Sequence, residues 1–187
     1  MIQTEPQRRA YLRALGIDVW VAQDQADPYD DGAAAAGDVA ADQLDWTELR
    51  AAVRDCTRCA LHASRTQTVF GVGNKAADWL IIGEAPGAEE DRRGEPFVGR
   101  AGQLLDEMLR AAGKERGEVF IANILKCRPP NNRDPETAEA AACRGYLLRQ
   151  VELIQPKIIL AVGRIAAQQL LDTDTSNRQD EIGRAHV

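Results

Sequence analysis

The chain has 187 residues, which is enough for one domain with a core of ordinary size and too few for two large domains. Hydrophobic residues make up 44% and charged residues 28%, a composition typical of a soluble globular protein and not of a fibrous or low-complexity one. No apolar run approaches the roughly 20 residues that span a bilayer, and the first residues lack the apolar segment of a signal peptide. We therefore expect a cytoplasmic protein that does not enter a membrane.

The negative charge is concentrated at the N-terminus. Residues 1–45 hold nine acidic and three basic residues, which accounts for the whole formal net charge of -6, so residues 46–187 are neutral. A neutral domain can still present a basic face, although its total charge gives no argument for one. Residues 23–45 are rich in Asp, Ala and Gly, with almost nothing to bury. We therefore expect an N-terminal arm and linker over residues 1–45.

Strands and helices alternate along the rest of the chain. The hydrophobic pattern predicts helices beginning near Trp46 and over 101–112, 134–154 and 163–171, and strands over 78–83, 119–125 and 157–162. Asp134 is the expected N-cap of the third helix, with Pro135 at its first position. Such alternation implies right-handed crossovers and a parallel sheet between helices. The predicted fold is therefore an α/β, three-layer α/β/α sandwich with a central parallel sheet.

The end of the chain departs from this pattern. After the last predicted helix, residues 172–187 lose all periodicity, and the final EIGRAHV looks like the translation of a sequencing adapter. We therefore expect an incomplete domain over residues 46–175 that is truncated at its C-terminus, followed by a non-native tail over residues 176–187.

The four cysteines of the chain are candidate ligands of a metal site. Cys56 and Cys59 form a C-x2-C pair, whereas fifteen residues separate Cys127 from Cys143. Four thiolates can bind one zinc ion or the four irons of a cubane cluster. A zinc site made of two knuckles prefers two close pairs, and the second pair here is wide. The pattern favours an iron-sulfur cluster over zinc, with ordinary buried thiols as the remaining alternative.

Polar and aromatic residues follow the predicted strands, where parallel α/β folds place their ligand sites. Glu84 and Glu90 could divide acid, base and water-positioning roles, or simply be solvated. Phe97 could stack on a flat ligand or anchor its loop. The amide of Asn123 could read the edge of a nucleobase or tie down a neighbouring loop.

Basic residues lie at the same predicted edge. Two helices open behind a glycine, at 99–103 and 163–164, so their backbone amides could hold phosphates. The loop 126–133 is basic and stiffened by proline, and phosphate contact there competes with plain solvation. His62 is expected to be an exposed bystander.

Three motifs in order, GEAPGAEED, GEPFVGRAGQLLDEML and NILKCRPPNNRDP, together with the four cysteines, resemble the family 4 uracil-DNA glycosylases. The resemblance covers roughly residues 46–172. It implies a uracil-DNA glycosylase-like fold and hydrolysis of the N-glycosidic bond of deoxyuridine in DNA, which leaves an abasic site for base excision repair. It also implies a 4Fe-4S cluster, whose ligands would be Cys56, Cys59, Cys127 and Cys143.

The resemblance assigns roles to individual residues. Phe97 would stack on the flipped uracil, Asn123 would bond its Watson–Crick edge, and Glu90 would exclude the methyl group of thymine. Gly83 would line the base, and Glu84 would face the water side of the sugar. Glu84, Asn123 and Glu90 are thus the expected catalytic residues, although a backbone carbonyl or a DNA phosphate could position the water instead of Glu84. The expected DNA-binding residues are Arg100, Gln103, Arg128, Arg133 and Arg164.

One family feature has no match in this sequence. The family carries a downstream His-Pro-Ser segment that supplies a histidine donor to the uracil oxygen, and residues 172–187 contain nothing similar. Losing one such donor typically costs about 100- to 1,000-fold in rate. We therefore expect this chain to be an impaired glycosylase.

The expected partner is uracil-containing DNA, single- or double-stranded, bound by a monomer, with the N-terminal arm docking a replication or repair protein. Two alternatives stay open. One is a non-catalytic DNA-binding accessory related to a phage DNA polymerase. The other is a zinc-binding hydrolase with an unrelated substrate.

Overall fold

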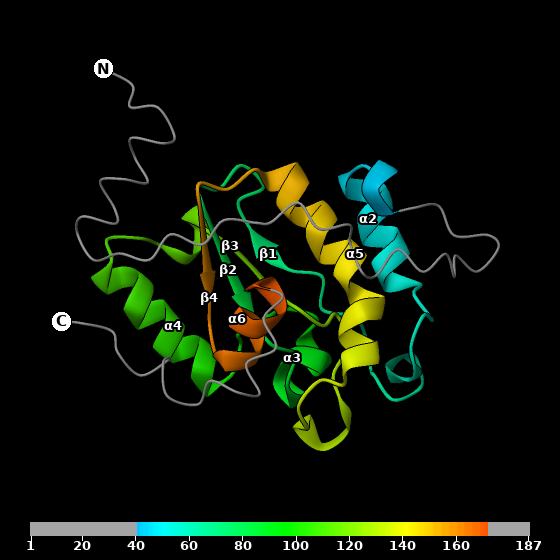
Figure 1. Cartoon of the computed structure of the whole chain (residues 1–187). Helices are drawn as coiled ribbons and strands as arrows, with labels where there is room; N and C mark the ends of the chain where they lie inside the picture. The colour runs from blue at the N-terminus through cyan, green and yellow to red at the C-terminus, as the bar shows by residue number, and fades with distance from the viewer. Residues whose placement is uncertain (1–40, 172–187) are drawn as a thin grey trace, which may run out of the picture. The chain divides into compact units, whose positions relative to one another are not determined.

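The computed structural model describes residues 41–171, which form a four-stranded sheet packed between helices (Figure 1). The strand order is β1-β3-β2-β4, with bounds Val72–Gly73 for β1, Trp79–Gly83 for β2, Phe120–Asn123 for β3 and Ile158–Ala161 for β4. Strand β2 runs parallel to both β3 and β4, whereas β1 is antiparallel to β3. The carboxyl ends of β2, β3 and β4 therefore meet at one edge of the sheet.

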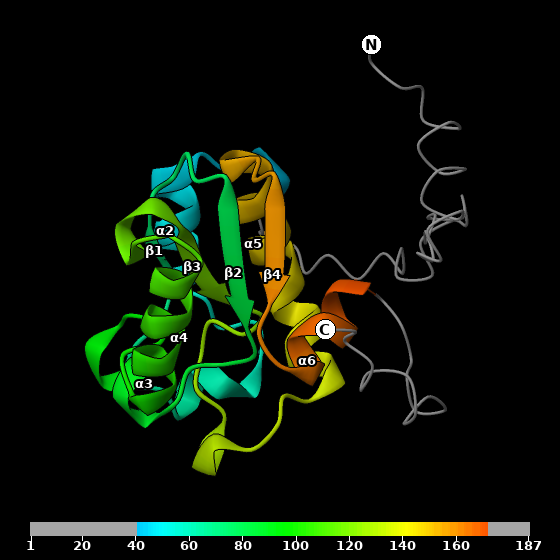
Figure 2. The same cartoon turned by 90° about the vertical axis from the view of Figure 1, so that its left-hand side faces the viewer.

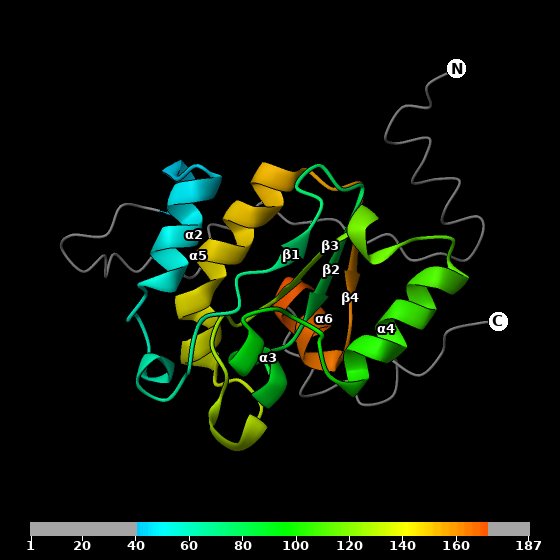
Figure 3. The same ribbon diagram turned by 180° about the vertical axis from the view of Figure 1, so that it is seen from behind.

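The helices lie on both faces of this sheet. Their bounds are Trp46–Arg54 for α2, Ala88–Arg93 for α3, Arg100–Ala111 for α4, Thr137–Ile154 for α5 and Arg164–Leu171 for α6. Short 3-10 turns occur at Ala41–Gln43, Ala60–Ala63, Arg116–Glu118 and Pro130–Asn132. Figures 2 and 3 show α4 on one side of the sheet and α2 and α5 on the other.

The alternation of side chains along β2 explains the layers. Leu80 and Ile82 join the core on the side of α2 and α5, which includes Leu49 and Leu147. Ile81 faces the opposite way and packs in the smaller core beneath α4. Because both faces of the strand are buried, its sequence is continuously apolar. The three-layer α/β/α prediction is confirmed.

Three details differ from the sequence prediction. The sheet is mixed and not purely parallel, because the two-residue strand β1 adds to its edge. The six-residue helix α3 was not predicted, since its sequence AEEDRR has no apolar period. The N-cap of α5 is Glu136 and not Asp134, because the Glu139 carboxylate accepts the Glu136 backbone N–H and stops the helix from starting earlier.

The described part of the predicted linker belongs to the domain. Ala41 is buried, and the Arg149 side chain in α5 donates a hydrogen bond to the Leu44 carbonyl at 2.7 Å. The rest of the predicted arm, residues 1–40, and the predicted tail lie outside the described residues. Within residues 41–171, none of the helices has the length and apolar character needed to cross a membrane.

Candidate functional site

Three of the residues predicted to bind a base meet at the carboxyl ends of β2 and β3. Gly83 and Asn123 are register partners at the last positions of these strands. A Cβ atom added at Gly83 would lie 2.5 Å from Asn123 Oδ1 and 2.6 Å from Phe97 Cζ. The amide and the aromatic ring therefore both lie directly against the bare backbone of Gly83. Their meeting point joins a flat apolar surface to a hydrogen-bonding group.

A buried polar network holds the backbone of Asn123 in place. Its backbone carbonyl accepts a hydrogen bond from Lys126 Nζ at 2.9 Å, and the same ammonium donates to Gln150 Oε1 at 2.6 Å. Gln150 in turn donates to the Phe70 carbonyl. Burial lowers the pKa of Lys126 to about 8, because the low-dielectric interior disfavours the charged form. The sequence analysis missed this network, which fixes the turn after β3.

The loop that carries Phe97 has an unusual backbone. Phe97 has a φ of 54°, in the left-handed region that non-glycine residues seldom occupy. The start of α4 lies against this loop, because a Cβ atom at Gly102 would sit only 1.8 Å from the Phe97 carbonyl oxygen. On another side Arg116 donates to the Pro96 carbonyl at 2.6 Å. The strained conformation is thus imposed by its surroundings, as is common where a side chain is presented to a ligand.

Glu90 binds backbone groups with both of its carboxylate oxygens. Oε1 accepts hydrogen bonds from the backbone N–H groups of Val98 and Gly99 at 3.0 and 3.1 Å, and Oε2 accepts one from Gly87 at 3.1 Å. The neighbouring carboxylate, Asp91, is buried and accepts the Thr66 backbone N–H at 3.0 Å. The sequence analysis missed Asp91, whose burial depends on contacts with a segment 25 residues away.

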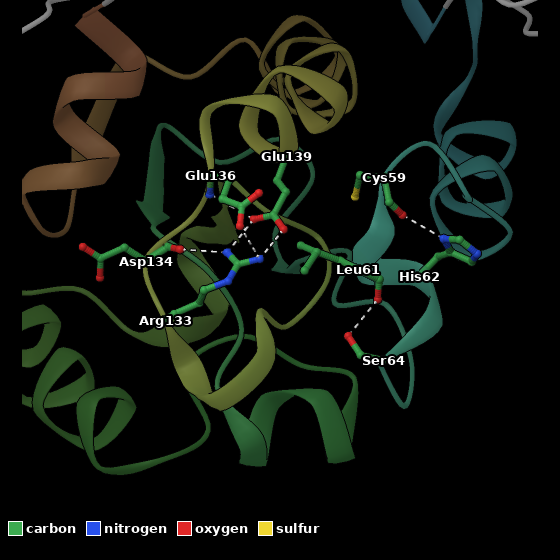
Figure 4. A network of polar contacts seen from close by, with 8 residues as sticks. All are labelled: Cys59, Leu61, His62, Ser64, Arg133, Asp134, Glu136 and Glu139. Carbon is green, nitrogen blue, oxygen red and sulfur yellow. Dashed lines mark hydrogen bonds and ion pairs between the residues drawn. The ribbon is translucent and has the colours of Figure 1, made fainter.

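Glu84 follows β2 at the same edge. Partial burial raises the pKa of its carboxyl, the negative charge of Asp134 raises it further, and the positive charge of Arg164 opposes both. Figure 4 shows the Asp134 carboxylate turned away from the ion pair between Arg133 and Glu139. Asp134 and Arg164 therefore act on the pKa of Glu84 in opposite directions, although the three residues come from three different segments.

All four cysteines line one cavity. It is bordered by Cys56 and Cys59 after α2, by Cys127 after β3 and by Cys143 inside α5. Burial raises the pKa of the Cys127 thiol and raises that of Cys143 to about 11. The two cysteine pairs, far apart in sequence, thus lie around the same cavity.

Positive groups and hydrogen-bond donors surround these thiols. Arg65 donates to Cys127 Sγ at 3.0 Å, and the Arg58 backbone N–H donates to Cys56 Sγ at 3.5 Å. Lys126 and His62 also line the cavity. Figure 4 shows the His62 ring bonded to the Cys59 carbonyl in the 3-10 turn that follows Cys59; this distance is 2.8 Å. The His62 side chain is exposed, as expected. The arrangement can compensate the negative charge of thiolates.

The predicted DNA-binding residues occupy different environments. Arg133 is engaged within the protein: its guanidinium bonds both carboxylate oxygens of Glu139, at 2.6 and 2.9 Å, and the Asp134 carbonyl (Figure 4). Arg128 donates from Nε to Asn132 Oδ1, and Arg164 donates to Gln168. Exposed positions at the start of α4 are held by Arg100 and Gln103. Arg133 therefore anchors its loop to α5.

A family model described as the uracil DNA glycosylase superfamily matches residues 70–186. This range includes residues 176–186, for which a non-native tail was expected. The chain is 53% identical over 116 residues to a type-4 uracil-DNA glycosylase of Archaeoglobus fulgidus, covering 62% of the chain and 58% of that protein. It is 44% identical over 140 residues to the type-4 enzyme of Pyrobaculum aerophilum, covering 75% of the chain and 71% of that protein.

A more distant match is a DNA polymerase of Bacillus phage SP01, 33% identical over 101 residues that make up only 11% of that protein. The chain spans 58% of the Archaeoglobus fulgidus relative and 62% of a type-4 enzyme of Thermotoga maritima, which is less than two thirds of either. The range that the family model matches includes the strand-end site, Cys127 and Cys143.

Proposed function

Because the chain belongs to the uracil DNA glycosylase superfamily, with type-4 enzymes among its relatives, we propose that it hydrolyses the N-glycosidic bond of deoxyuridine in DNA. The products are free uracil and an abasic site, the first step of base excision repair. The observation that carries this proposal is the meeting of Gly83, Phe97 and Asn123 at the ends of two parallel strands.

The site suits a base that has left the DNA stack. Enzymes that act on a base must first extrude it, at a cost of about a few kcal/mol that is smallest in a mismatch. The Phe97 ring supplies a stacking surface that replaces part of the lost stacking energy. The Asn123 amide has one acceptor and two donors, which match the N3–H group and a carbonyl oxygen of uracil. Gly83 lets the base approach the backbone because it has no side chain.

Charge at the site suits the transition state. Departure of uracil leaves an oxocarbenium-like sugar and a uracil anion, so negative charge near the sugar and donors at the base both stabilise it. Glu84 is the carboxylate at the end of β2, and it either stabilises the sugar cation or orients the attacking water. Asn123 donates to the base as its negative charge develops.

Glu84 gives a prediction for the dependence on pH. Because its pKa is raised, the Glu84 carboxylate becomes protonated at a higher pH than the carboxylate of an ordinary glutamate as the pH falls. Asp134→Asn removes a charge that raises this pKa, so the acidic limb of the rate profile should move to lower pH. Arg164→Gln removes a charge that lowers it, so the limb should move to higher pH.

The measurement is the single-turnover rate of uracil release at saturating enzyme across the acidic range, because saturation removes any effect of Arg164 on DNA affinity. Asp78→Asn is the matched control: Asp78 lies before β2, at the opposite end of the strand, where it pairs with Lys157. An acidic limb that stays in place in both Asp134→Asn and Arg164→Gln would exclude Glu84 as the titrating group.

For the cofactor we propose a 4Fe-4S cluster bound by Cys56, Cys59, Cys127 and Cys143. Their convergence on one cavity and the neighbouring positive groups support it. Within residues 41–171, no three or more His, Cys, Asp or Glu side chains are grouped so that they could hold one single metal ion. Each thiolate of a cubane binds its own iron, so the sulfur atoms lie further apart than the ligands of one zinc ion. When bound, the cluster cross-links α5 to the segments that follow α2 and β3.

The proposed reaction and its substrate preference are tested by measuring release of free uracil from a single strand, a U:G mismatch and a U:A pair. We expect release from a single strand and from a U:G mismatch to exceed release from a U:A pair, because extrusion of the base is easiest there. Equal affinity for uracil-containing and uracil-free duplexes, with no release from any of them, would instead support a non-catalytic DNA-binding accessory. The phage polymerase match gives that alternative little support, because it covers so small a part of the polymerase.

Docking by the N-terminal arm and the monomeric state stay predictions.

A further inference from the structure

Helix α3 carries two adjacent carboxylates that hold different parts of the protein. Glu90 accepts the backbone N–H groups of Val98 and Gly99, which immediately follow Phe97. These bonds fix the segment whose neighbour has the left-handed φ of 54°. Hydrogen bonds to a charged acceptor are stronger than bonds between neutral groups. The position of the Phe97 ring therefore depends on where α3 holds Glu90.

Asp91 connects the same helix to the chain near the cysteines. Its buried carboxylate accepts the backbone N–H of Thr66 with both oxygens, each at 3.0 Å, and lies 3.5 Å from the N–H of Gln67. The Gln67 side chain adds a bond from Nε2 to the Arg92 carbonyl at 2.8 Å. Segment 65–67 and α3 thus form one hydrogen-bonded unit although they are far apart in sequence.

The other side of that segment reaches the cysteine cavity. Arg65 precedes Thr66 and donates to Cys127 Sγ at 3.0 Å. A second nitrogen of its guanidinium donates to the Arg54 carbonyl at the end of α2. A continuous series of hydrogen bonds and short covalent links therefore leads from Cys127 through Arg65, Thr66 and Asp91 to Glu90 and the Phe97 loop.

We propose that α3 is a strut between the thiol-lined cavity and the Phe97 loop, and that Glu90 and Asp91 are positioning residues. Of this inference, only the expected effect on the rate of uracil release rests on the proposed function. Glu90 acts through the backbone of residues 98 and 99 and not as a wall against the methyl group of thymine. The thiol site, through Arg65, helps to set the place of the ring that stacks on the base.

Amide hydrogen exchange on the full chain without DNA tests the strut directly. Glu90→Ala should raise the exchange rates of the 98 and 99 amides by at least about tenfold, and Glu90→Gln, which keeps one acceptor oxygen, by less. Asp91→Asn and Arg65→Gln should raise exchange at 66 and 67, and also at 98 and 99. Glu89→Gln is the matched control, because Glu89 is exposed on the same helix. Within residues 41–171 its ion pairs are those with Arg92 and Arg93.

Activity supplies a second readout. Glu90→Ala should lower the single-turnover rate of uracil release by about 10- to 100-fold, with little change in DNA affinity and with no release of thymine from a T:G mismatch. Release of thymine by this variant would make Glu90 a wall of the base pocket and overturn its positioning role. Wild-type exchange at 98 and 99 in Asp91→Asn and Arg65→Gln would overturn the strut.

The two readouts separate this inference from the proposed function. If the wild-type chain releases no uracil, the exchange rates still decide whether α3 couples the two sites. If Asp91→Asn fails to fold, Glu90→Gln and Arg65→Gln decide it, because both side chains are partly exposed and less critical for the core.

Discussion

If the chain holds the proposed 4Fe-4S cluster, replacing Cys143 by alanine should abolish both the visible absorbance of that cluster and the stable fold. Cys143 lies inside α5 and is buried against the segment of Cys127. Losing one of the four proposed ligands would release the proposed cluster and remove the cross-link that it would make between α5, β3 and the end of α2. Loss of a structural metal site is among the few single changes that lower the free energy of unfolding by more than about 4 kcal/mol.

Iron and sulfide content, the visible spectrum and a denaturant titration measure this effect. Ala142→Ser is the matched control, because Ala142 lines the same cavity but offers no thiol. Its iron content and stability should stay close to those of the parent chain. A folded Cys143→Ala variant with full iron content would contradict the assigned ligand set, and stoichiometric zinc in the parent chain would favour a mononuclear site.

Replacing Gly83 by alanine should reduce uracil excision by about 100-fold while the domain stays folded. The added methyl group would lie 2.5 Å from Asn123 Oδ1 and 2.6 Å from the Phe97 ring, so both of the groups proposed to contact the base must move. Because Gly83 has no positive φ, the effect is steric and not a consequence of backbone strain. Overpacking of this kind also lowers stability by about 1–3 kcal/mol.

Single-turnover excision and thermal melting, measured together, distinguish these two effects. Gly117→Ala is the matched control, because a methyl group there meets nothing within 4 Å and the residue has no positive φ. Wild-type excision by Gly83→Ala would show that Gly83, Phe97 and Asn123 do not form the base-binding site.

The elements that could be predicted from the sequence are those with a local pattern of hydrophobic residues. Strands β2 and β4 are apolar runs, and the amphipathic period of α4 is followed by Gly113. Their order along the chain predicted parallel strands, whose carboxyl ends must meet. The approach of Asn123 to Gly83 follows from that topology alone.

Features that depend on tertiary contacts were not predictable. Lys126 and Asp91 are buried because groups distant in sequence bond them: Gln150 Oε1 accepts a hydrogen bond from Lys126, and Asp91 accepts the Thr66 backbone N–H. No local pattern reports such partners. The ion pair of Arg133 was not predictable for the same reason, because Glu139, which binds its guanidinium, is buried in α5. DNA binding by Arg133 stays a prediction. Both short elements, α3 and β1, lack the length needed for a periodic pattern.

Excision of uracil by this chain tests the central claim most directly. A labelled oligonucleotide with one uracil is incubated with an excess of cluster-loaded protein, then treated with alkali to cleave abasic sites, alongside Asn123→Ala and a thymine-containing oligonucleotide. We expect the parent chain to cleave at the uracil over this time. Neither cleavage of the thymine-containing oligonucleotide nor cleavage by Asn123→Ala should be detectable. No cleavage by the loaded parent chain, or equal cleavage by Asn123→Ala, would contradict the proposed function.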